Sequence, residues 1–230
     1  MTPQKSNRQP EHQLEHHVRE VISGNRRFEN VYESLTRMIL SNSGNIEKKF
    51  VNGRTLYDYK VLRQGKKHIV GMFEEVNSFV SFVKDAAEGG SSSEMAFVLI
   101  GEPGNGKTFF VDYISELYRN FIALPENRRY TFRFKNLEKI GGYGKINVVE
   151  SQTYEDPMIL AMNLYDSKAE NVKFIQNLGA TEQQVEKFYQ NYRPLGACSY
   201  YILNQILNYL DGDVNKLDEF VDVVVVPISE

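Results

Sequence analysis

Residues 101–108 are the part of the sequence whose types and spacing most clearly imply chemistry. In order they are Gly101, Glu102, Pro103, Gly104, Asn105, Gly106, Lys107 and Thr108. They fit the pattern G-x-x-x-x-G-K-[ST] in full. Glycines let the backbone curl until successive N–H groups face inward, where they can hold phosphate oxygens. The stretch predicts a binding loop for a nucleoside triphosphate, in the first instance ATP.

Two side chains of this loop carry the expected reaction chemistry. Lys107 would place a positive charge beside the β- and γ-phosphates, and it is the candidate catalytic residue. The Thr108 hydroxyl would bind Mg²⁺, an ion that takes few protein ligands and keeps several waters. Phe109 follows directly and completes the predicted cofactor-binding residues. The expected cofactors are therefore ATP and Mg²⁺.

The residues on either side of the loop predict the elements that position it. Met95–Ile100 is an uninterrupted apolar run, as expected for a strand buried on both faces of a parallel sheet. A helix is predicted over Lys107–Phe121, because apolar residues recur there at helical spacing. Its N-terminus would present free N–H groups and a favourable dipole to an anion. Strand, loop and helix thus agree with one another.

Periodicity and turn residues predict further elements along the chain. Two helices are expected between His12 and Leu40, separated at Gly24-Asn25, and Ser41–Asn52 is turn-rich. Thr181 and Gln184 fit a capping box at the start of another helix. The other predicted elements are a helix over Val76–Ala87, a strand over Arg129–Lys135, helices over Pro157–Leu164, Thr181–Tyr192 and Ser199–Leu210, and a strand over Val221–Ile228.

Composition favours a globular intracellular protein. Of the 230 residues 41% are apolar, the net charge is −3, and there is one cysteine. No apolar run is long enough to cross a membrane, and the charge does not favour a nucleic-acid partner. A single cysteine suits a reducing cytoplasm. We expect a disordered tail over residues 1–13, a helical region over 14–67 and a nucleotide-binding domain over 68–230.

Four further features bear on activity. An acidic strand motif that would hold Mg²⁺ and activate water is not found, since Ile206–Asp211 fits poorly and Val223–Val226 leads into Pro227. Gly141–Lys145 is either a turn or a second phosphate loop. His68 is either a surface residue or a contact to the nucleotide base. Cys198 is interpreted as a core thiol.

Four stretches carry a family resemblance that covers residues 68–230. They are Gly71-Met72 with Phe79–Gly89, the loop at 101–108, Tyr154–Leu160, and Tyr209–Val214 with Val223–Val226 and Ser229-Glu230. In type and order they resemble the N-terminal ATPase domain of the bacterial PrkA-type serine protein kinases, which belong to the AAA+ class.

The resemblance implies a fold and an activity. The implied fold is an α/β P-loop NTPase of AAA+-like kind, with three α/β/α layers around a parallel sheet, preceded by a helical segment. Family members continue beyond the point matching Glu230, so we expect the domain to be incomplete at its C-terminus. The implied activity is ATP-dependent protein phosphorylation or remodelling in stress signalling, with an unknown protein substrate. By resemblance, Gly104, Gly106, Lys107 and Thr108 contact phosphate and metal.

Two other functions stay open at this point. One is a P-loop phosphotransferase for a small substrate, for which Arg128, Arg129 and Arg133 are available. The other is a non-catalytic nucleotide sensor that assembles into homo-oligomers, as AAA+ domains often do.

Overall fold

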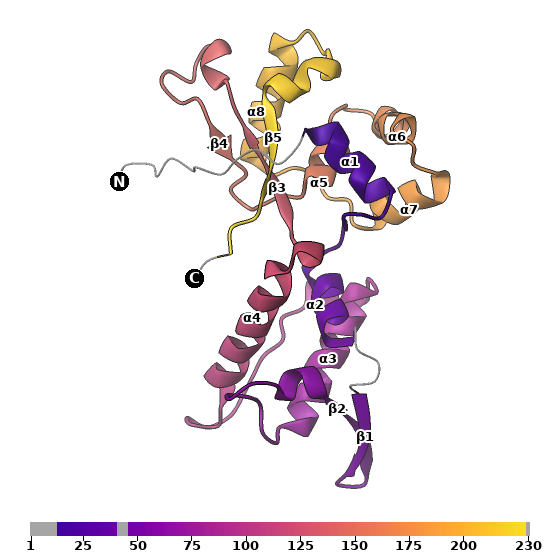
Figure 1. Cartoon of the computed structure of the whole chain (residues 1–230), viewed down its shortest axis with the longest axis vertical. Helices are drawn as coiled ribbons and strands as arrows, with labels where there is room; N and C mark the ends of the chain where they lie inside the picture. The colour runs from indigo at the N-terminus through magenta and orange to yellow at the C-terminus, as the bar shows by residue number, and fades with distance from the viewer. Residues whose placement is uncertain (1–12, 41–45, 229–230) are drawn as a thin grey trace. The chain divides into compact units, whose positions relative to one another are not determined.

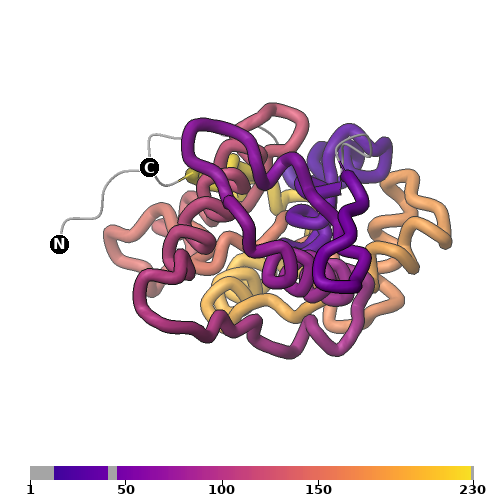
Figure 2. Tube along the Cα trace, turned by 90° about the horizontal axis from the view of Figure 1, so that it is seen from below, coloured from indigo at the N-terminus to yellow at the C-terminus, as the bar shows by residue number. Residues whose placement is uncertain are grey.

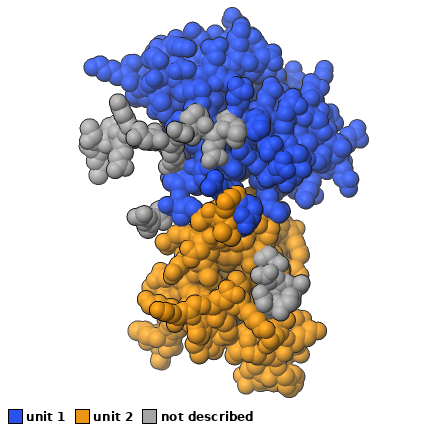
Figure 3. Space-filling model, in the orientation of Figure 1, with its two compact units in different colours: residues 1–28, 126–230 blue, residues 29–125 orange. Residues whose placement is uncertain are grey.

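The computed structural model describes residues 13–40 and 46–228, which fall into two compact units (Figure 3). Unit 1 comprises Met1–Phe28 and Glu126–Glu230, and unit 2 comprises Glu29–Pro125. Each unit has a hydrophobic core of its own. Apart from residue 13, the tail expected to be disordered lies outside the described residues.

Unit 1 combines helices with a three-stranded antiparallel sheet in the order β4-β3-β5. In the central pair, Tyr130 lies opposite Val225 and Phe134 opposite Val221. The first helix, α1, contributes to the same core as the C-terminal elements. In chain order the helices and strands are α1 (Leu14–Ile22), β3 (Tyr130–Phe134), β4 (Val149–Glu150), α5 (Pro157–Ala161), α6 (Lys168–Asn177), α7 (Glu182–Gln190), α8 (Ala197–Tyr209) and β5 (Val221–Val225) (Figure 1).

Unit 2 is a group of helices with a two-stranded hairpin, and its chain path can be followed in Figure 2. Asn52 and Gly53, both with positive φ, form the turn of the hairpin. Buried residues of three helices share one core, in which the rings of Phe79 and Phe110 meet edge to face at 5.3 Å. The elements are α2 (Val31–Leu40), β1 (Ile46–Val51), β2 (Arg54–Tyr59), α3 (Phe73–Ala87) and α4 (Lys107–Ala123).

The expected α/β P-loop fold, with three layers around a parallel sheet, is wrong. Every strand pair in the described part of the chain is antiparallel, and the two sheets contain two and three strands. The fold is a mixture of helices and two small antiparallel sheets. The resemblance to AAA+ domains had implied parallel order, which local sequence patterns alone do not specify because strand pairing is a long-range property.

The segment Met95–Ile100 was the main reason to expect that sheet, and it is not a strand. Phe97 packs its ring against Phe79 and Phe82 of α3, whereas Ile100 is 92% exposed. Helix α3 therefore covers one side of the segment, and the other side is exposed to solvent. An apolar run becomes a doubly buried strand only where neighbouring strands supply hydrogen bonds and cover, and the described residues place no strand beside it.

Most helices predicted from periodicity are confirmed. The break at Gly24-Asn25 separates α1 from α2, and the predicted helices at Val76–Ala87 and Lys107–Phe121 correspond to α3 and α4. The Thr181–Gln184 capping box is present at the start of α7. The segment called turn-rich, Ser41–Asn52, instead contains β1, although residues 41–45 lie outside the described residues.

Asp58 links the hairpin of unit 2 to the segment that precedes α3 through hydrogen bonds. Its side chain is 7% exposed and accepts hydrogen bonds from Lys49 Nζ and Arg63 Nε, each at 2.5 Å. Arg63 also donates to the carbonyls of Ile69 and Gly71. Burial by itself raises the pKa of Asp58, but the two hydrogen bonds and the positive charges outweigh it and leave the pKa below its ordinary value of 3.8.

We expect Asp58→Asn to destabilise unit 2 by about 1–3 kcal/mol at pH 7, the range for charge-assisted hydrogen bonds. Because the pKa is lowered in the folded state, the stabilisation is complete above pH 3.8 and is lost as pH falls through the folded pKa. Urea unfolding at pH 7 and at pH 3 should therefore show a smaller difference between parent and variant in acid. Asp112→Asn, at an exposed carboxylate of α4, serves as the control. A difference that stayed constant with pH would contradict this role of Asp58.

Candidate functional site

Residues 101–108 form a largely exposed loop that runs directly into α4, which begins at Lys107 (Figure 1). Gly104 and Gly106 have φ of 87° and 75°, and Gly106 is the N-cap of the helix. These angles lie in the left-handed region, where a side chain is strained. The two glycines therefore allow the sharp turn that brings the loop into the helix.

The start of α4 offers backbone amides that the helix does not use. The first helical hydrogen bond runs from Phe110 N–H to the carbonyl of Gly106, at 2.8 Å. The amides of Lys107, Thr108 and Phe109 precede it and have no carbonyl one turn earlier in the helix. Glycine at the N-cap provides no side-chain acceptor either. These groups and the helix dipole favour an anion at this position.

The Lys107 ammonium lies within the curve of the loop. It donates hydrogen bonds to the carbonyl oxygens of Gly101 and Glu102, both at 2.6 Å. A Cβ atom at position 101 would lie 3.7 Å from the ammonium, an ordinary van der Waals contact. Both of its partners are neutral carbonyls, so its charge is available to an anion that enters the loop.

Thr108, the second residue of α4, is exposed. Among residues 13–40 and 46–228, no three His, Cys, Asp or Glu side chains gather to hold a metal ion. A magnesium ion here would thus be held by the Thr108 hydroxyl, phosphate oxygens and water. That donor set fits Mg²⁺, which prefers oxygen ligands and gives up its waters reluctantly.

The turn before α3 borders the loop. A Cβ atom at Gly106 would lie 3.9 Å from the sulfur of Met72, which is the N-cap of α3 and has a φ of 51°. Arg63 holds this turn through the carbonyls of Ile69 and Gly71. His68 is exposed, with its Nδ1 3.1 Å from the carbonyl oxygen of Gly65. Met72 is thus the residue of this turn that the structure brings to the loop, although only His68 was named from the sequence as a possible contact to the base.

Phe109, the last predicted site residue, presents its ring beside the helix start. The ring is 39% exposed and stacks on Tyr113 at 5.8 Å. Tyr113 is buried, and its hydroxyl donates to the carbonyl of Gln64 at 2.7 Å. The exposed ring of Phe109 is thereby fixed in place and can stack on a flat ligand.

Asp211, which was considered for the missing motif, and Asp222, which precedes Val223–Val226, have different surroundings. Asp211 has a φ of 50° in the turn that follows α8. Asp222 of β5 accepts hydrogen bonds from Arg133 and Lys135, so its charge is already balanced within the sheet of unit 1. The Asp222 carboxylate is therefore not an unpaired metal ligand.

Two other sequence interpretations can be compared with the structure. Gly141–Lys145 forms a turn, in which Ile146 N–H bonds the carbonyl of Tyr143 at 2.9 Å. The interpretation of Cys198 as a core thiol is wrong, because this cysteine is exposed. The buried stripe of α8 runs through Ser199, Ile202 and Ile206, and position 198 lies off that stripe.

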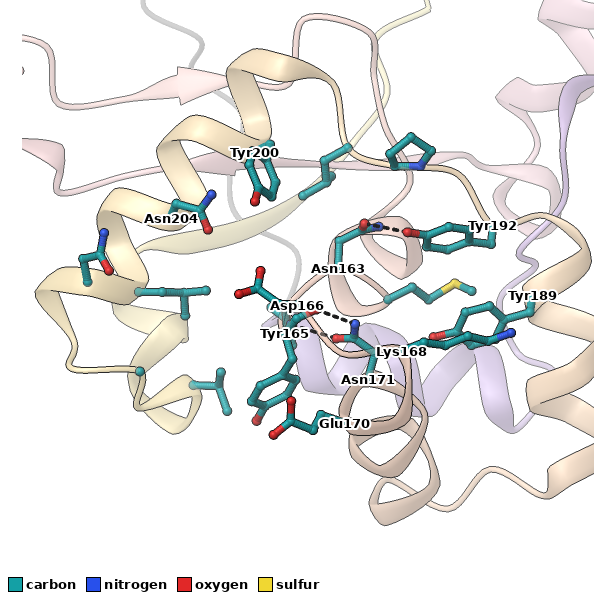
Figure 4. A pocket seen from close by; sticks show the side chains of 18 of the residues that line it. Asn163, Tyr165, Asp166, Lys168, Glu170, Asn171, Tyr189, Tyr192, Tyr200 and Asn204 are labelled. Atoms are coloured by element: carbon teal, nitrogen blue, oxygen red, sulfur yellow. Dashed lines mark hydrogen bonds between the residues drawn. The ribbon is translucent and has the colours of Figure 1, made fainter.

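The structure also contains a pocket in unit 1 that the sequence did not reveal. Its volume is about 950 Å³, and residues between positions 162 and 214 line it (Figure 4). Tyrosine and asparagine side chains predominate in its walls. The lining residues come from three helices and the segments next to them, with no motif of fixed spacing, so only the packing of α6, α7 and α8 and their adjoining segments brings them together.

Comparisons with family models, with curated proteins and with solved structures give no match to this chain. Within the part of the chain that the structure describes, there is also no helix of the length and apolarity needed to cross a membrane.

Proposed function

We propose that this protein binds Mg²⁺·ATP at residues 101–108. The observation that carries the proposal is the combination of a full G-x-x-x-x-G-K-[ST] motif with a helix start whose first amides are unused by the helix. Each part has a physical role toward a triphosphate. The amides and Lys107 stabilise its negative charge, and the Thr108 hydroxyl binds the accompanying magnesium.

The surroundings of the loop support an arrangement for the rest of the nucleotide. Met72 and Phe109 offer apolar or aromatic surface next to the phosphate-binding residues. A purine ring packs well against such side chains. The base would therefore lie near the turn that precedes α3.

The wider proposal is that ATP binding serves phosphorylation or remodelling of another protein in the cytoplasm. Its support is the resemblance of four stretches to the PrkA-type serine kinases. The nucleotide site is the part of this proposal that can be tested directly, with ATP and magnesium as the only additions.

Titration of the full chain with ATP, in the presence and absence of Mg²⁺, tests the nucleotide site. We expect Mg²⁺ to strengthen ATP binding. Thr108→Val should remove most of that gain and so weaken ATP binding in the presence of Mg²⁺ about tenfold in Kd, because valine keeps the shape of threonine but lacks its hydroxyl. Thr108→Ser retains a hydroxyl and should bind like the parent. If ATP does not bind to the parent in the presence of Mg²⁺, the proposed function is wrong.

A further inference from the structure

The pocket of unit 1 has the size and the composition of a binding site. Its volume of about 950 Å³ lies within the range of sites for small ligands and side chains. Four tyrosines line it, Tyr165, Tyr189, Tyr192 and Tyr200, together with Asp166 and Asn204. These side chains, labelled in Figure 4, come from α7, from α8, from the segment between α5 and α6 and from the segment between α7 and α8.

Some of its polar groups are used to build the wall. Asn171 accepts from the Tyr165 amide at 2.9 Å and donates to the Tyr165 carbonyl at 2.7 Å. The Tyr192 hydroxyl donates to Asn163 Oδ1 at 3.2 Å. These bonds fix the backbone of Tyr165 and the ring of Tyr192, so this wall is organised before any ligand arrives.

Other polar groups remain available. Within residues 13–40 and 46–228, the side chains of Asp166 and Asn204 make no hydrogen bond or ion pair. The Tyr189 hydroxyl also has no hydrogen-bond partner in the described part of the chain, but it is fully buried and so is not open to a ligand.

The charges divide the pocket into two sides. Asp166 and Glu170 are exposed carboxylates, and in Figure 4 Asp166 lies on the side of Tyr200 and Asn204. Burial raises the pKa of Tyr165, and the negative charges of Glu170 and Asp213 raise it further. The one lysine of the lining, Lys168, lies 4.5 Å from the centre of the Tyr189 ring. Carboxylates beside tyrosine faces attract an organic cation.

We propose that this pocket binds the cationic side chain, arginine or lysine, of a basic peptide segment. The cation would lie between Asp166 and the ring of Tyr200. Tyr192 and Tyr200 are 44% and 48% exposed, so the pocket is open to solvent on one side. An open pocket suits a side chain that extends from a longer chain, whereas a small metabolite is usually more enclosed.

Titration calorimetry of the full chain with Ac-Gly-Arg-Arg-Gly-NH₂ tests the proposal. The matched peptide Ac-Gly-Gln-Gln-Gly-NH₂ keeps length and hydrogen bonding but lacks the charge. We expect the arginine peptide to bind and the glutamine peptide to bind at least tenfold more weakly. Asp166→Asn should weaken the arginine peptide about tenfold, and Tyr200→Leu should weaken it several-fold.

Glu186→Gln is the matched control, because it removes one exposed carboxylate from α7 outside the pocket. Equal weakening by Glu186→Gln and Asp166→Asn would mean general attraction to an acidic surface, and would overturn the proposal. Equal binding of the two peptides would overturn it as well. Spermidine forms the third arm: binding of spermidine without binding of the arginine peptide would overturn the peptide assignment. Thermal unfolding checks that each variant is folded, and Mg²⁺·ATP titration tests the loop of unit 2 separately.

Discussion

Replacing Lys107 by alanine is expected to weaken binding of Mg²⁺·ATP by about 1–3 kcal/mol, which corresponds to roughly 5- to 150-fold in Kd. The ammonium is held inside the loop by the carbonyls of Gly101 and Glu102, at 2.6 Å each. Alanine removes the only cation of the motif while leaving the glycine turns and the helix start in place. Titration calorimetry of parent and variant measures the effect.

A charge-matched control separates this local effect from the overall charge of the protein. Lys84→Ala removes one positive charge from α3, where the ammonium is exposed and pairs weakly with Glu88 at 3.8 Å. Its ATP affinity should equal that of the parent. If Lys107→Ala binds ATP as tightly as the parent does, the loop has been assigned wrongly. Equal losses in both variants would point to non-specific attraction.

A comparison of stability tests whether unfolding of Lys107→Ala could cause its weaker ATP binding. Lys107 bonds only the exposed loop, so unit 2 should unfold at nearly the same urea concentration in parent and variant. The core beneath α4 rests on Phe110, Tyr113 and Ile114, which the change does not touch. Weakened binding with unchanged stability would therefore report on the phosphate contact.

The local parts of this site could be predicted from sequence because they depend on neighbours in the chain. Gly106 precedes Lys107, and a glycine before an amphipathic run predicts both the turn and the helix start. Thr181 and Gln184 predicted their capping box for the same reason, since both partners lie within one turn.

The sheets could not be predicted in the same way. The segment Met95–Ile100 is apolar enough for a buried strand, but burial depends on which strands lie beside it. In the structure Phe97 packs on α3 and Ile100 remains exposed. In the prediction the apolar run itself suggested a strand of a parallel sheet and the family resemblance implied the same order, and no local signal in these six residues could have corrected it.

The hairpin of unit 2 was missed although a local signal was present. Asn52-Gly53 is a strong signature of a tight hairpin turn, and the six register pairs run from Ile46 opposite Tyr59 to Val51 opposite Arg54. The prediction of a turn-rich segment rested on the polar residues before Ile46 and did not use the Asn52-Gly53 signature. The pocket of unit 1 is a different case, because its lining converges only through tertiary packing.

Glu155→Ala is the substitution with the largest expected effect on stability, about 2–4 kcal/mol in unit 1. Glu155 is 4% exposed, and its carboxylate accepts hydrogen bonds from Ser151 Oγ at 2.9 Å, Ser199 Oγ at 2.5 Å and Gly196 N–H at 2.6 Å. Alanine would leave the two buried hydroxyls without their acceptor. It would also remove a negative charge from the N-terminus of α8, where the helix dipole favours one.

Urea unfolding measures the loss for Glu155→Ala, and amide hydrogen exchange in α8 assigns it to unit 1. Two variants test the mechanism. Glu155→Gln keeps an acceptor oxygen without the charge and should lose less, and Glu186→Ala on the exposed side of α7 should lose almost nothing. In a double-mutant cycle, Glu155→Ala and Ser199→Ala should be clearly non-additive, because each removes the same hydrogen bond. Additive losses would show that the carboxylate acts on α8 in some other way, since a shared bond can be lost only once.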